Sequence, residues 1–226
     1  SEVPQYLKDA YISIEDERFY SHNGVDIKRT VASTIRYILN RGNSSAGGGS
    51  TITQQTVKNS FKDKSDSGFA GVERKIREIS RAYKLEKLLS KDQILELYLN
   101  LIFLGQDVYG VQLGATYYFN KSVGDLDLAE CAFLAGINNS PNSYNPFGES
   151  PNTDLIQRRT KIVLAKMKEL GKISEEEYNS AKEEVEAGLK FEKGNTSTGT
   201  TMSYLARAAL NDVISQYMEE KNMDYN

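Results

Sequence analysis

The segment 44–59, SSAGGGSTITQQTVKN, passes from a glycine- and serine-rich run directly into a polar stretch with helical spacing. Thr51 and Gln54 have the spacing of a capping box, which predicts that a helix begins there. Thr51, Gln55 and Lys58 then share one helical face, with Gln54 beside them. Glycines allow close backbone approach, a helix start offers free N–H groups, and Lys58 adds positive charge. The segment therefore predicts a site for phosphate and sugar hydroxyls. It is not a Walker loop, because no Gly-Lys-Ser/Thr follows at the required spacing. A mobile linker before a polar helix explains the same residues.

A second group of reactive side chains surrounds Glu15 in the segment 14–24, IEDERFYSHNG. If this segment is helical, Glu15, Phe19 and His22 share a face. A carboxylate beside an aromatic ring and apolar Ile14 is partly desolvated, which favours its use as a general base. An ordinary acidic helix turn is the alternative. Because the chain has one histidine and one cysteine, a His/Cys zinc site is excluded and acid–base chemistry should rest on carboxylates.

A third group lies on one helical face around Glu78, with Arg74 four residues earlier and Lys75 beside it. It supplies a carboxylate held by cations, as a charge-stabilising site needs. Ion pairs on a solvated helix face explain it equally well. Basic residues outnumber acidic ones ten to five over 58–91, although the whole chain has a net charge of −3. This local excess suggests an anionic ligand, and the overall charge argues against nucleic acid. Tyr98 could line a sugar site through its ring and hydroxyl, or it could be a core residue.

The elements that must position these groups are helices almost throughout. Apolar spacing, caps and glycine stops predict helices over 3–20, 27–42, from 51, 72–89, 91–105, 108–119, 127–137, 153–171, 175–189 and 202–221. Asp26, Ser90 and Ser174 are the expected N-caps. No strand of ordinary length is predicted, so the fold class is all-α. The sequence contains no uninterrupted apolar run long enough to span a membrane.

Five sequence blocks, taken in order, resemble the peptidoglycan glycosyltransferases of glycosyltransferase family 51, found in class A penicillin-binding proteins. The blocks are EDERFYSHNGVD, GGSTITQQTVKN, RKIREISRAYKLE, KDQILELYLN and YGVQLGATYYFNK, and LAECAFLAGINNSPNSYNP follows them. The resemblance covers roughly residues 3–190, and GGSTITQQ is its most specific block.

The resemblance implies a lysozyme-like helical fold with a large head lobe and a smaller, mobile jaw lobe, roughly within 27–72, that contacts the membrane. It implies that the domain occupies 1–193 and that 194–226 form a linker and helix leading toward a transpeptidase domain outside this chain. The implied activity is polymerisation of lipid II into glycan strands at the outer face of the bacterial cytoplasmic membrane. Configuration inverts, and polyprenyl diphosphate leaves. An N-terminal transmembrane anchor outside the chain and sensitivity to moenomycin, a phosphoglycolipid, are also expected.

The resemblance also assigns roles to individual residues. Glu15 matches the general base, and Glu78 matches a second catalytic glutamate that acts electrostatically. A divalent metal, Mg²⁺ or Mn²⁺, bound through Glu78 is an option that the resemblance leaves open, and no organic cofactor is expected. The remaining residues expected to bind or orient the substrate are His22, Ser50, Thr51, Gln54, Gln55, Lys58, Asn59, Arg74, Lys75 and Tyr98.

The chain departs from the family pattern in one segment, and two other functions remain as alternatives. A further phosphate-binding cation is expected between the second and third blocks, where only Lys62 or Lys64 could substitute. One alternative is a lysozyme-like hydrolase or lytic enzyme on the same fold. It would need a carboxylate but not the cations Lys58, Arg74 and Lys75. The other is a non-catalytic helical module that binds an anionic partner.

Overall fold

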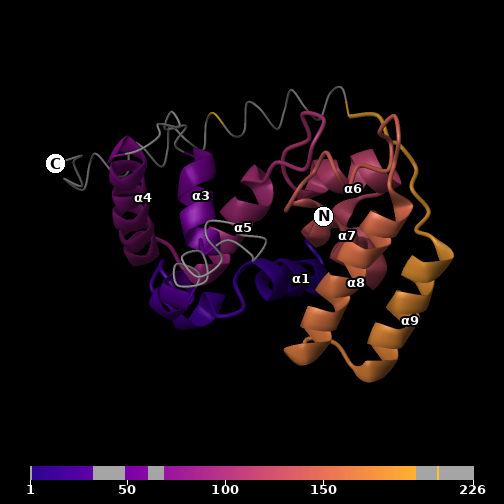
Figure 1. The fold of residues 1–226 in the computed structure, drawn as a ribbon, viewed down its shortest axis with the longest axis horizontal. Helices are drawn as coiled ribbons and strands as arrows, with labels where there is room; N and C mark the ends of the chain where they lie inside the picture. The colour runs from indigo at the N-terminus through magenta and orange to yellow at the C-terminus, as the bar shows by residue number, and fades with distance from the viewer. Residues whose placement is uncertain (1, 33–48, 61–68, 197–207, 209–226) are drawn as a thin grey trace.

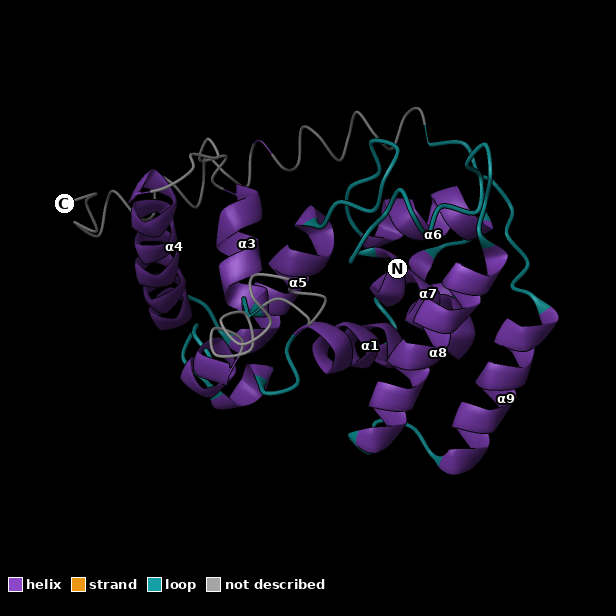
Figure 2. Cartoon of the chain, in the orientation of Figure 1, coloured by secondary structure: helices purple, strands orange, loops and turns teal. Residues whose placement is uncertain are grey.

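The computed structural model describes residues 2–32, 49–60, 69–196 and 208 of the chain. The helices in these ranges are α1 (Gln5–Glu15), the 3-10 helix η1 (Phe19–Ser21), α3 (Ile52–Ser60), α4 (Phe69–Leu88), α5 (Lys91–Leu101), α6 (Val111–Phe119), the 3-10 helix η2 (Val123–Asp125), α7 (Leu128–Ile137), α8 (Thr153–Glu169) and α9 (Glu175–Ala187). Residues 27–32 are also helical. Within the described ranges the only β pairing is an isolated bridge between Phe103 and Tyr109, so the all-α prediction is confirmed (Figures 1 and 2).

The helices form two groups joined by α1 and α5. Figure 1 shows α3 and α4 at one end of the molecule and α6 to α9 at the other. Helix α3 packs against both α4 and α5, whereas α1 packs against α7 and α8. The two central helices therefore connect α3 and the basic helix α4 to the larger helical group.

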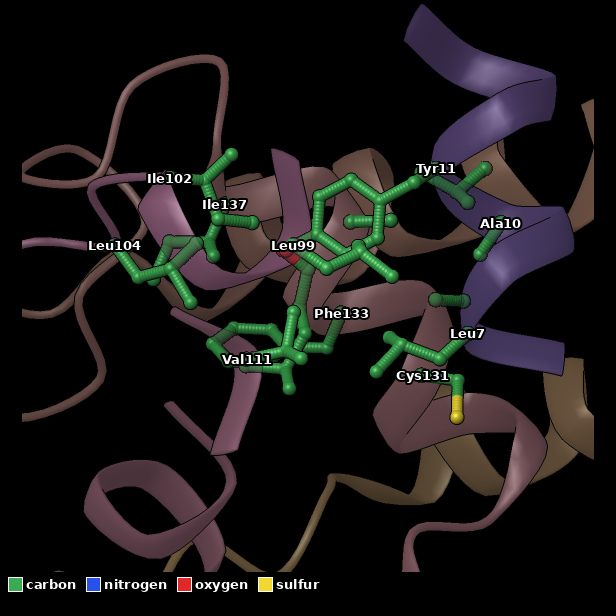
Figure 3. Close-up of a cluster of buried hydrophobic side chains, with 14 of the residues drawn as sticks. Leu7, Ala10, Tyr11, Leu99, Ile102, Leu104, Val111, Cys131, Phe133 and Ile137 are labelled. Atoms are coloured by element: carbon green, nitrogen blue, oxygen red, sulfur yellow. The ribbon is translucent and has the colours of Figure 1, made fainter. Parts of the chain in front are cut away.

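The hydrophobic core centres on α7, whose residues from Ala129 to Ile137 are all buried. Figure 3 shows Leu7 and Tyr11 of α1 meeting Cys131 and Phe133 of α7 in this core. Burial raises the pKa of the Cys131 thiol, and the negative charges of Asp127 and Glu130 act in the same direction. This core fixes the end of α1, where Glu15 lies.

The predicted N-caps are confirmed by side-chain to backbone hydrogen bonds. Ser90 and Ser174 form complete capping boxes at the starts of α5 and α9. Asp26 accepts the backbone N–H of Arg29 at 2.9 Å, the geometry of an N-cap for the helix that begins at residue 27. These interactions span three residues, which is why the sequence alone could identify them.

Two predicted helices end earlier than their apolar spacing suggested. The first helix stops at Glu15 rather than near residue 20, because Asp16 has an extended φ of −157° and a short 3-10 turn follows. The fifth stops at Leu101, because Ile102 has an extended ψ of 140°. Phe19, Ile102 and Leu104 lie beyond these ends and are buried, so they continued the apolar pattern without continuing the helix.

Several predicted segments fall partly or wholly outside the described residues. Outside them lie Lys62, Lys64, most of the expected jaw lobe within 27–72 and, apart from residue 208, the helix expected over 202–221. These expectations stay predictions. No helix in the described part of the chain is long and apolar enough to cross a membrane. The expected linker begins packed against the helices, since Gly194 donates its N–H to the Tyr117 carbonyl at 3.4 Å.

Candidate active site

Glu15 lies at the carboxyl end of α1, where three parts of the chain converge on it. Its side chain is half-buried. The Gln55 amide of α3 donates to Oε2 at 2.9 Å, and the Asn138 amide at the end of α7 donates to Oε1 at 3.2 Å. Arg29 donates to the backbone carbonyl of Glu15. The carboxylate is thus held by two neutral donors while part of it remains exposed, as a general base requires.

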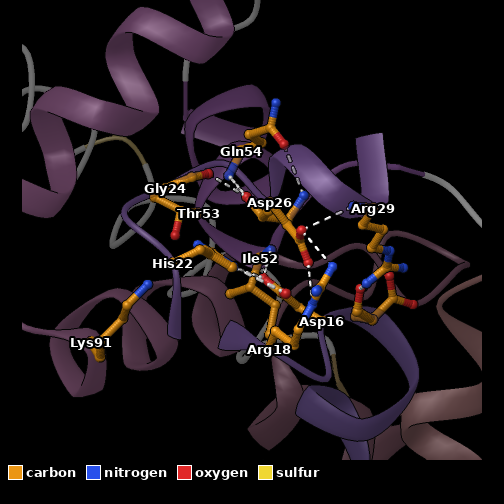
Figure 4. Close-up of polar contacts among 12 residues, drawn as sticks. Asp16, Arg18, His22, Gly24, Asp26, Arg29, Ile52, Thr53, Gln54 and Lys91 are labelled. Atoms are coloured by element: carbon orange, nitrogen blue, oxygen red, sulfur yellow. Dashed lines mark hydrogen bonds and ion pairs between the residues drawn. The ribbon is translucent and has the colours of Figure 1, made fainter. Parts of the chain in front are cut away.

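The loop after α1 is tied to the start of α3 by the fully buried carboxylate of Asp16 (Figure 4). Its Oδ2 accepts the backbone N–H of Ile52 at 2.9 Å and lies 2.9 Å from Nε2 of His22. The expectation that Glu15, Phe19 and His22 share a helical face is wrong, because the helix ends before Phe19. His22 instead contacts Asp16, which fits the orienting role expected of it.

Thr51 and Gln54 form the predicted capping box at the start of α3. Each backbone N–H is accepted by the other residue's side chain, at 3.0 and 3.1 Å. The Thr51 hydroxyl also donates to the Gly24 carbonyl at 2.6 Å. Both residues are buried, with 0% and 1% of their surface exposed, so the structure places them behind the site as supports and not at its surface.

Gly24 lets this loop approach α4 closely. Its φ is +84°, and a Cβ at this position would lie 2.8 Å from the carbonyl oxygen of Ala82. A side chain here would therefore push the loop away from α4, and Thr51, which bonds to Gly24, would move with it. The loop after α1, the start of α3 and helix α4 therefore pack together as one unit.

The cationic group gathers around Glu78 on α4, as its spacing predicted. Glu78 is buried with 6% of its surface exposed, and it pairs with the ammonium group of Lys75. Arg74 lies 4.0 Å from the same carboxylate, and its Nε is buried without a hydrogen-bond partner. Lys75 also donates to the Ser50 hydroxyl at 2.9 Å. Ser50 lies two residues before α3, and Gln55, which contacts Glu15, lies in the first half of α3. The two groups therefore contact the same short segment, residues 50–55.

Two further predicted residues lie near the carboxyl end of α3. Lys58 is exposed in the last turn of α3, and Asn59 beside it is half-buried. Gln55, which donates to Glu15, lies one turn before them on the same helix. Helix α3 therefore carries an exposed cation one turn from a residue that contacts the carboxylate.

Tyr98 occupies the core rather than the site surface. It has no exposed surface, and its hydroxyl accepts a hydrogen bond from Asn138 at 3.0 Å. Burial raises the pKa of this phenol well above its ordinary value of 10, with a smaller contribution from the negative charge of Glu15. The expected direct contact with a ligand does not fit this position, and Tyr98 reaches Glu15 only through Asn138.

The metal expectation can be compared with the side chains present. Among the described residues, no group of three or more His, Cys, Asp or Glu side chains is arranged to hold a metal ion. Glu78 faces Lys75 and Arg74, so its surroundings fit a carboxylate neutralised by cations better than a resident metal site. Metal binding through Glu78 stays a prediction.

Three residues in this site were not identified from the sequence: Asp16, Arg29 and Asn138. Asp16 follows Glu15 directly but lies beyond the end of α1, which the apolar spacing did not predict. Asn138 lies 123 residues from Glu15 in the chain, so no local pattern connects the two. The run NNSPNSYNP indicated only a turn-rich loop, and the position of its first residue beside Glu15 depends on the packing of α7 against α1.

Comparisons with known proteins show which family this chain is similar to. A family model described as Transglycosylase matches residues 1–168. The chain is 44% identical over 225 residues to Penicillin-binding protein 1A of Clostridium perfringens, covering 97% of this chain and 32% of that protein. It is 40% identical over 219 residues to Penicillin-binding protein 1A of Neisseria flavescens, covering 97% and 26%. The chain thus spans about a third or less of the length of these relatives.

A solved structure is also similar to part of the chain. The crystal structure of Penicillin-Binding Protein 1A from Haemophilus influenzae aligns with 63% of this chain and 17% of that chain. The aligned residues are 31% identical, and the TM-score is 0.42.

Proposed function

Because this chain belongs to the transglycosylase family, we propose that it polymerises lipid II into the glycan strands of peptidoglycan. The reaction is an inverting glycosyl transfer that releases polyprenyl diphosphate. One observation carries the proposal. A half-buried carboxylate, Glu15, and a separate cationic group around Glu78 both contact the short segment that leads into and forms α3. A base and a site for an anionic leaving group are the two parts that this transfer needs.

Glu15 acts as the general base. It takes the proton of the acceptor sugar's 4-hydroxyl as that oxygen forms a bond to the donor's anomeric carbon. The bond from that carbon to the diphosphate breaks at the same time, and its electron pair leaves with the diphosphate. Attack from the face opposite the leaving group inverts the configuration. The two amide donors on Glu15 support this role because they fix the direction of the carboxylate.

The cations neutralise the diphosphate as it leaves. A diphosphate is already a good leaving group, so it needs positive charge more than a general acid. Lys75 donates to Ser50 near the start of α3, Arg74 lies 4.0 Å from the same Glu78 carboxylate that Lys75 contacts, and Lys58 extends from the last turn of α3. The Arg74 side chain is 30% exposed, so its guanidinium charge can act on a phosphate group. Glu78 holds the two α4 cations in place.

The cellular setting follows from the substrate and the relatives. We place the activity at the outer face of the bacterial cytoplasmic membrane, where a polyprenyl-linked donor and a growing glycan chain meet the enzyme. The relatives are several times longer than this chain, which is consistent with a membrane anchor and a transpeptidase domain in the full-length protein. Contact between the jaw lobe and the membrane surface belongs to the same proposal.

A glycan hydrolase is the main competing function. It would use a carboxylate in the same position, but it would have no need for the cationic group on α4. A non-catalytic module that binds an anionic partner would need the cations but not a held carboxylate. The presence of both groups favours the transferase over each alternative.

Incubating the chain with lipid II tests the proposal directly. The unaltered chain should form glycan polymer, and Glu15→Gln should lower the rate by at least about 100-fold while the circular dichroism spectrum is unchanged. Glu17→Gln is the matched control, since Glu17 is 41% exposed, pairs with Lys166 and should leave the rate unchanged. Cleavage of preformed glycan without polymerisation of lipid II, or full activity of Glu15→Gln, would contradict the proposal.

A further inference from the structure

We propose that Asn138 is a positioning residue for this reaction, which holds the carboxylate of Glu15 in the direction needed for proton transfer. The inference rests on the proposed function of Glu15 as the base. It adds a residue that contacts the base from 123 positions further along the chain and a second residue, Tyr98, that holds Asn138 in turn.

The amide of Asn138 has one arrangement that satisfies its neighbours. Asn138 follows the last residue of α7 and keeps helical backbone angles. Its Nδ2 donates one hydrogen to Glu15 Oε1 at 3.2 Å and the other to the Tyr98 hydroxyl at 3.0 Å. Because an ionised carboxylate can only accept, the amide must present its nitrogen to Glu15, and both of its N–H groups are then used.

Tyr98 makes the Asn138 side chain rigid. Its ring is buried on α5 and packs edge-to-face against Tyr11 of α1, with the ring centres 5.8 Å apart. The Tyr11 hydroxyl donates in turn to the Leu134 carbonyl of α7 at 2.9 Å. The two tyrosines therefore link α1, α5 and α7, the three helices whose relative positions decide where Glu15 and Asn138 meet.

The two oxygens of Glu15 are held from opposite sides by neutral donors. Gln55 on α3 binds Oε2, and Asn138 after α7 binds Oε1. Hydrogen bonds to the charged form stabilise it relative to the protonated form. Neutral amides do this without forming an ion pair. The stronger attraction of an ion pair would make the carboxylate a weaker base for the incoming proton. Each oxygen keeps a lone pair for the acceptor hydroxyl.

The other titratable and charged groups near Glu15 do not produce the same effect. Burial raises the pKa of both Tyr11 and Tyr98 well above 10, so both stay neutral at the pH of catalysis. Arg29 donates to the Glu15 carbonyl. Asp16 follows Glu15 in the chain and faces His22 and Ile52. Of these four residues, Tyr98 is the one that accepts a hydrogen bond from the Asn138 amide.

The experiment measures the pH dependence of lipid II polymerisation for Asn138→Ala and Asn138→Asp. A plot of polymerisation rate against pH has an acidic limb, where the rate falls as the base is protonated. Because Asn138→Ala removes a donor to Glu15, the midpoint of this acidic limb should move to higher pH by about one unit. Asn138→Asp adds a like charge about 3 Å from Oε1, and its shift should be larger. At the pH optimum kcat should fall by about 10-fold, because the base is less well oriented, whereas KM should change less than about twofold.

Two further variants separate positioning from general damage. Asn139→Asp makes the same chemical change at the next residue, which is exposed, and should leave the acidic limb unchanged. Tyr98→Phe keeps the buried ring but removes the acceptor that holds Asn138, so it should move the limb in the same direction by a smaller amount. Because Phe fits the apolar core, this variant also tests the inference if Asn138→Asp does not fold.

The outcomes distinguish the inference from the proposed function. If the unaltered chain makes no polymer, the proposed function fails, and the role of Asn138 fails with it. If the chain polymerises lipid II but Asn138→Ala and Tyr98→Phe keep the acidic limb of the unaltered chain, only the role of Asn138 is wrong. An equal shift in Asn139→Asp and Asn138→Asp would also overturn it, because the effect would then be general surface charge.

Discussion

At the scale of single residues, the buried carboxylate of Asp16 anchors the loop directly after Glu15 to the start of α3. It is 0% exposed and joins the imidazole of His22 to the N–H of Ile52. Removing it would leave two buried polar groups without an acceptor. The sequence pointed to His22 through its expected helical face with Glu15 and the family resemblance, but the structure gives the connecting role to its acidic partner.

We predict that Asp16→Ala lowers the free energy of unfolding by about 3–5 kcal/mol, because one member of a buried polar network is removed. Urea denaturation followed by circular dichroism measures this. Asp125→Ala, at an exposed aspartate, should change the same quantity by less than about 0.5 kcal/mol. Equal losses in the two variants would contradict the anchoring role of Asp16.

At the scale of elements, Asp26 combines a helix cap with an ion pair. It accepts the Arg29 N–H at 2.9 Å, and the Arg18 guanidinium donates to it at 2.8 Å through Nε. Burial acts to raise the pKa of Asp26, but the Arg29 N–H and the Arg18 charge outweigh it, so the pKa is lowered overall from 3.8. The ionised form is therefore favoured in the folded chain.

Asp26→Asn should show the pH dependence that this lowered pKa implies. Asparagine keeps the cap but loses the charge, so the unaltered chain should be more stable by about 1 kcal/mol at pH 7. A group with a lowered folded pKa stabilises above its unfolded pKa of about 3.8. The difference should therefore shrink as the pH falls below that value. Urea denaturation at a series of pH values measures it, and a difference that stays constant to pH 2.5 would rule out the charge effect.

At the scale of the whole molecule, residues 189–194 bind the end of the described chain to its core. Phe191 stacks on Phe119 with the ring centres 5.5 Å apart, and Glu192 donates its N–H to Tyr118. A Cβ at Gly194 would lie 2.2 Å from the carbonyl oxygen of Thr116. Only glycine lets the chain pass α6 at this distance, so the path toward the following segment is fixed by packing on α6.

We predict that Gly194→Ala displaces this segment from α6 and costs about 1–3 kcal/mol of stability, because the methyl group forces the backbone away. Hydrogen exchange should then be faster at the amide of Glu192. Gly148→Ala is the control, since its Cβ would lie at an ordinary 3.6 Å from the nearest atom. Unchanged exchange at Glu192 in Gly194→Ala would show that the segment tolerates a side chain.

Sequence reasoning was most successful where the interactions are local. The capping box of Thr51 and Gln54, the caps Ser90 and Ser174, and the group of Arg74, Lys75 and Glu78 all join residues within four positions. Spacing along a helix is enough to predict such contacts. The end of α1 was predicted too late, because buried apolar residues continue through the loop after Glu15 and resemble a longer helix.

The sequence by itself determined that this chain is all-α and which family it belongs to, and it supplied the candidate side chains for the chemistry, because helix spacing and the order of motif blocks are present along the chain. Only the tertiary structure decided which of those residues face the site. It buried Thr51, Gln54 and Tyr98 as supports, and it brought Asn138 to Glu15 across 123 residues. Such contacts depend on how α1, α5 and α7 pack together, and the packing of distant helices leaves no periodic signal in the sequence.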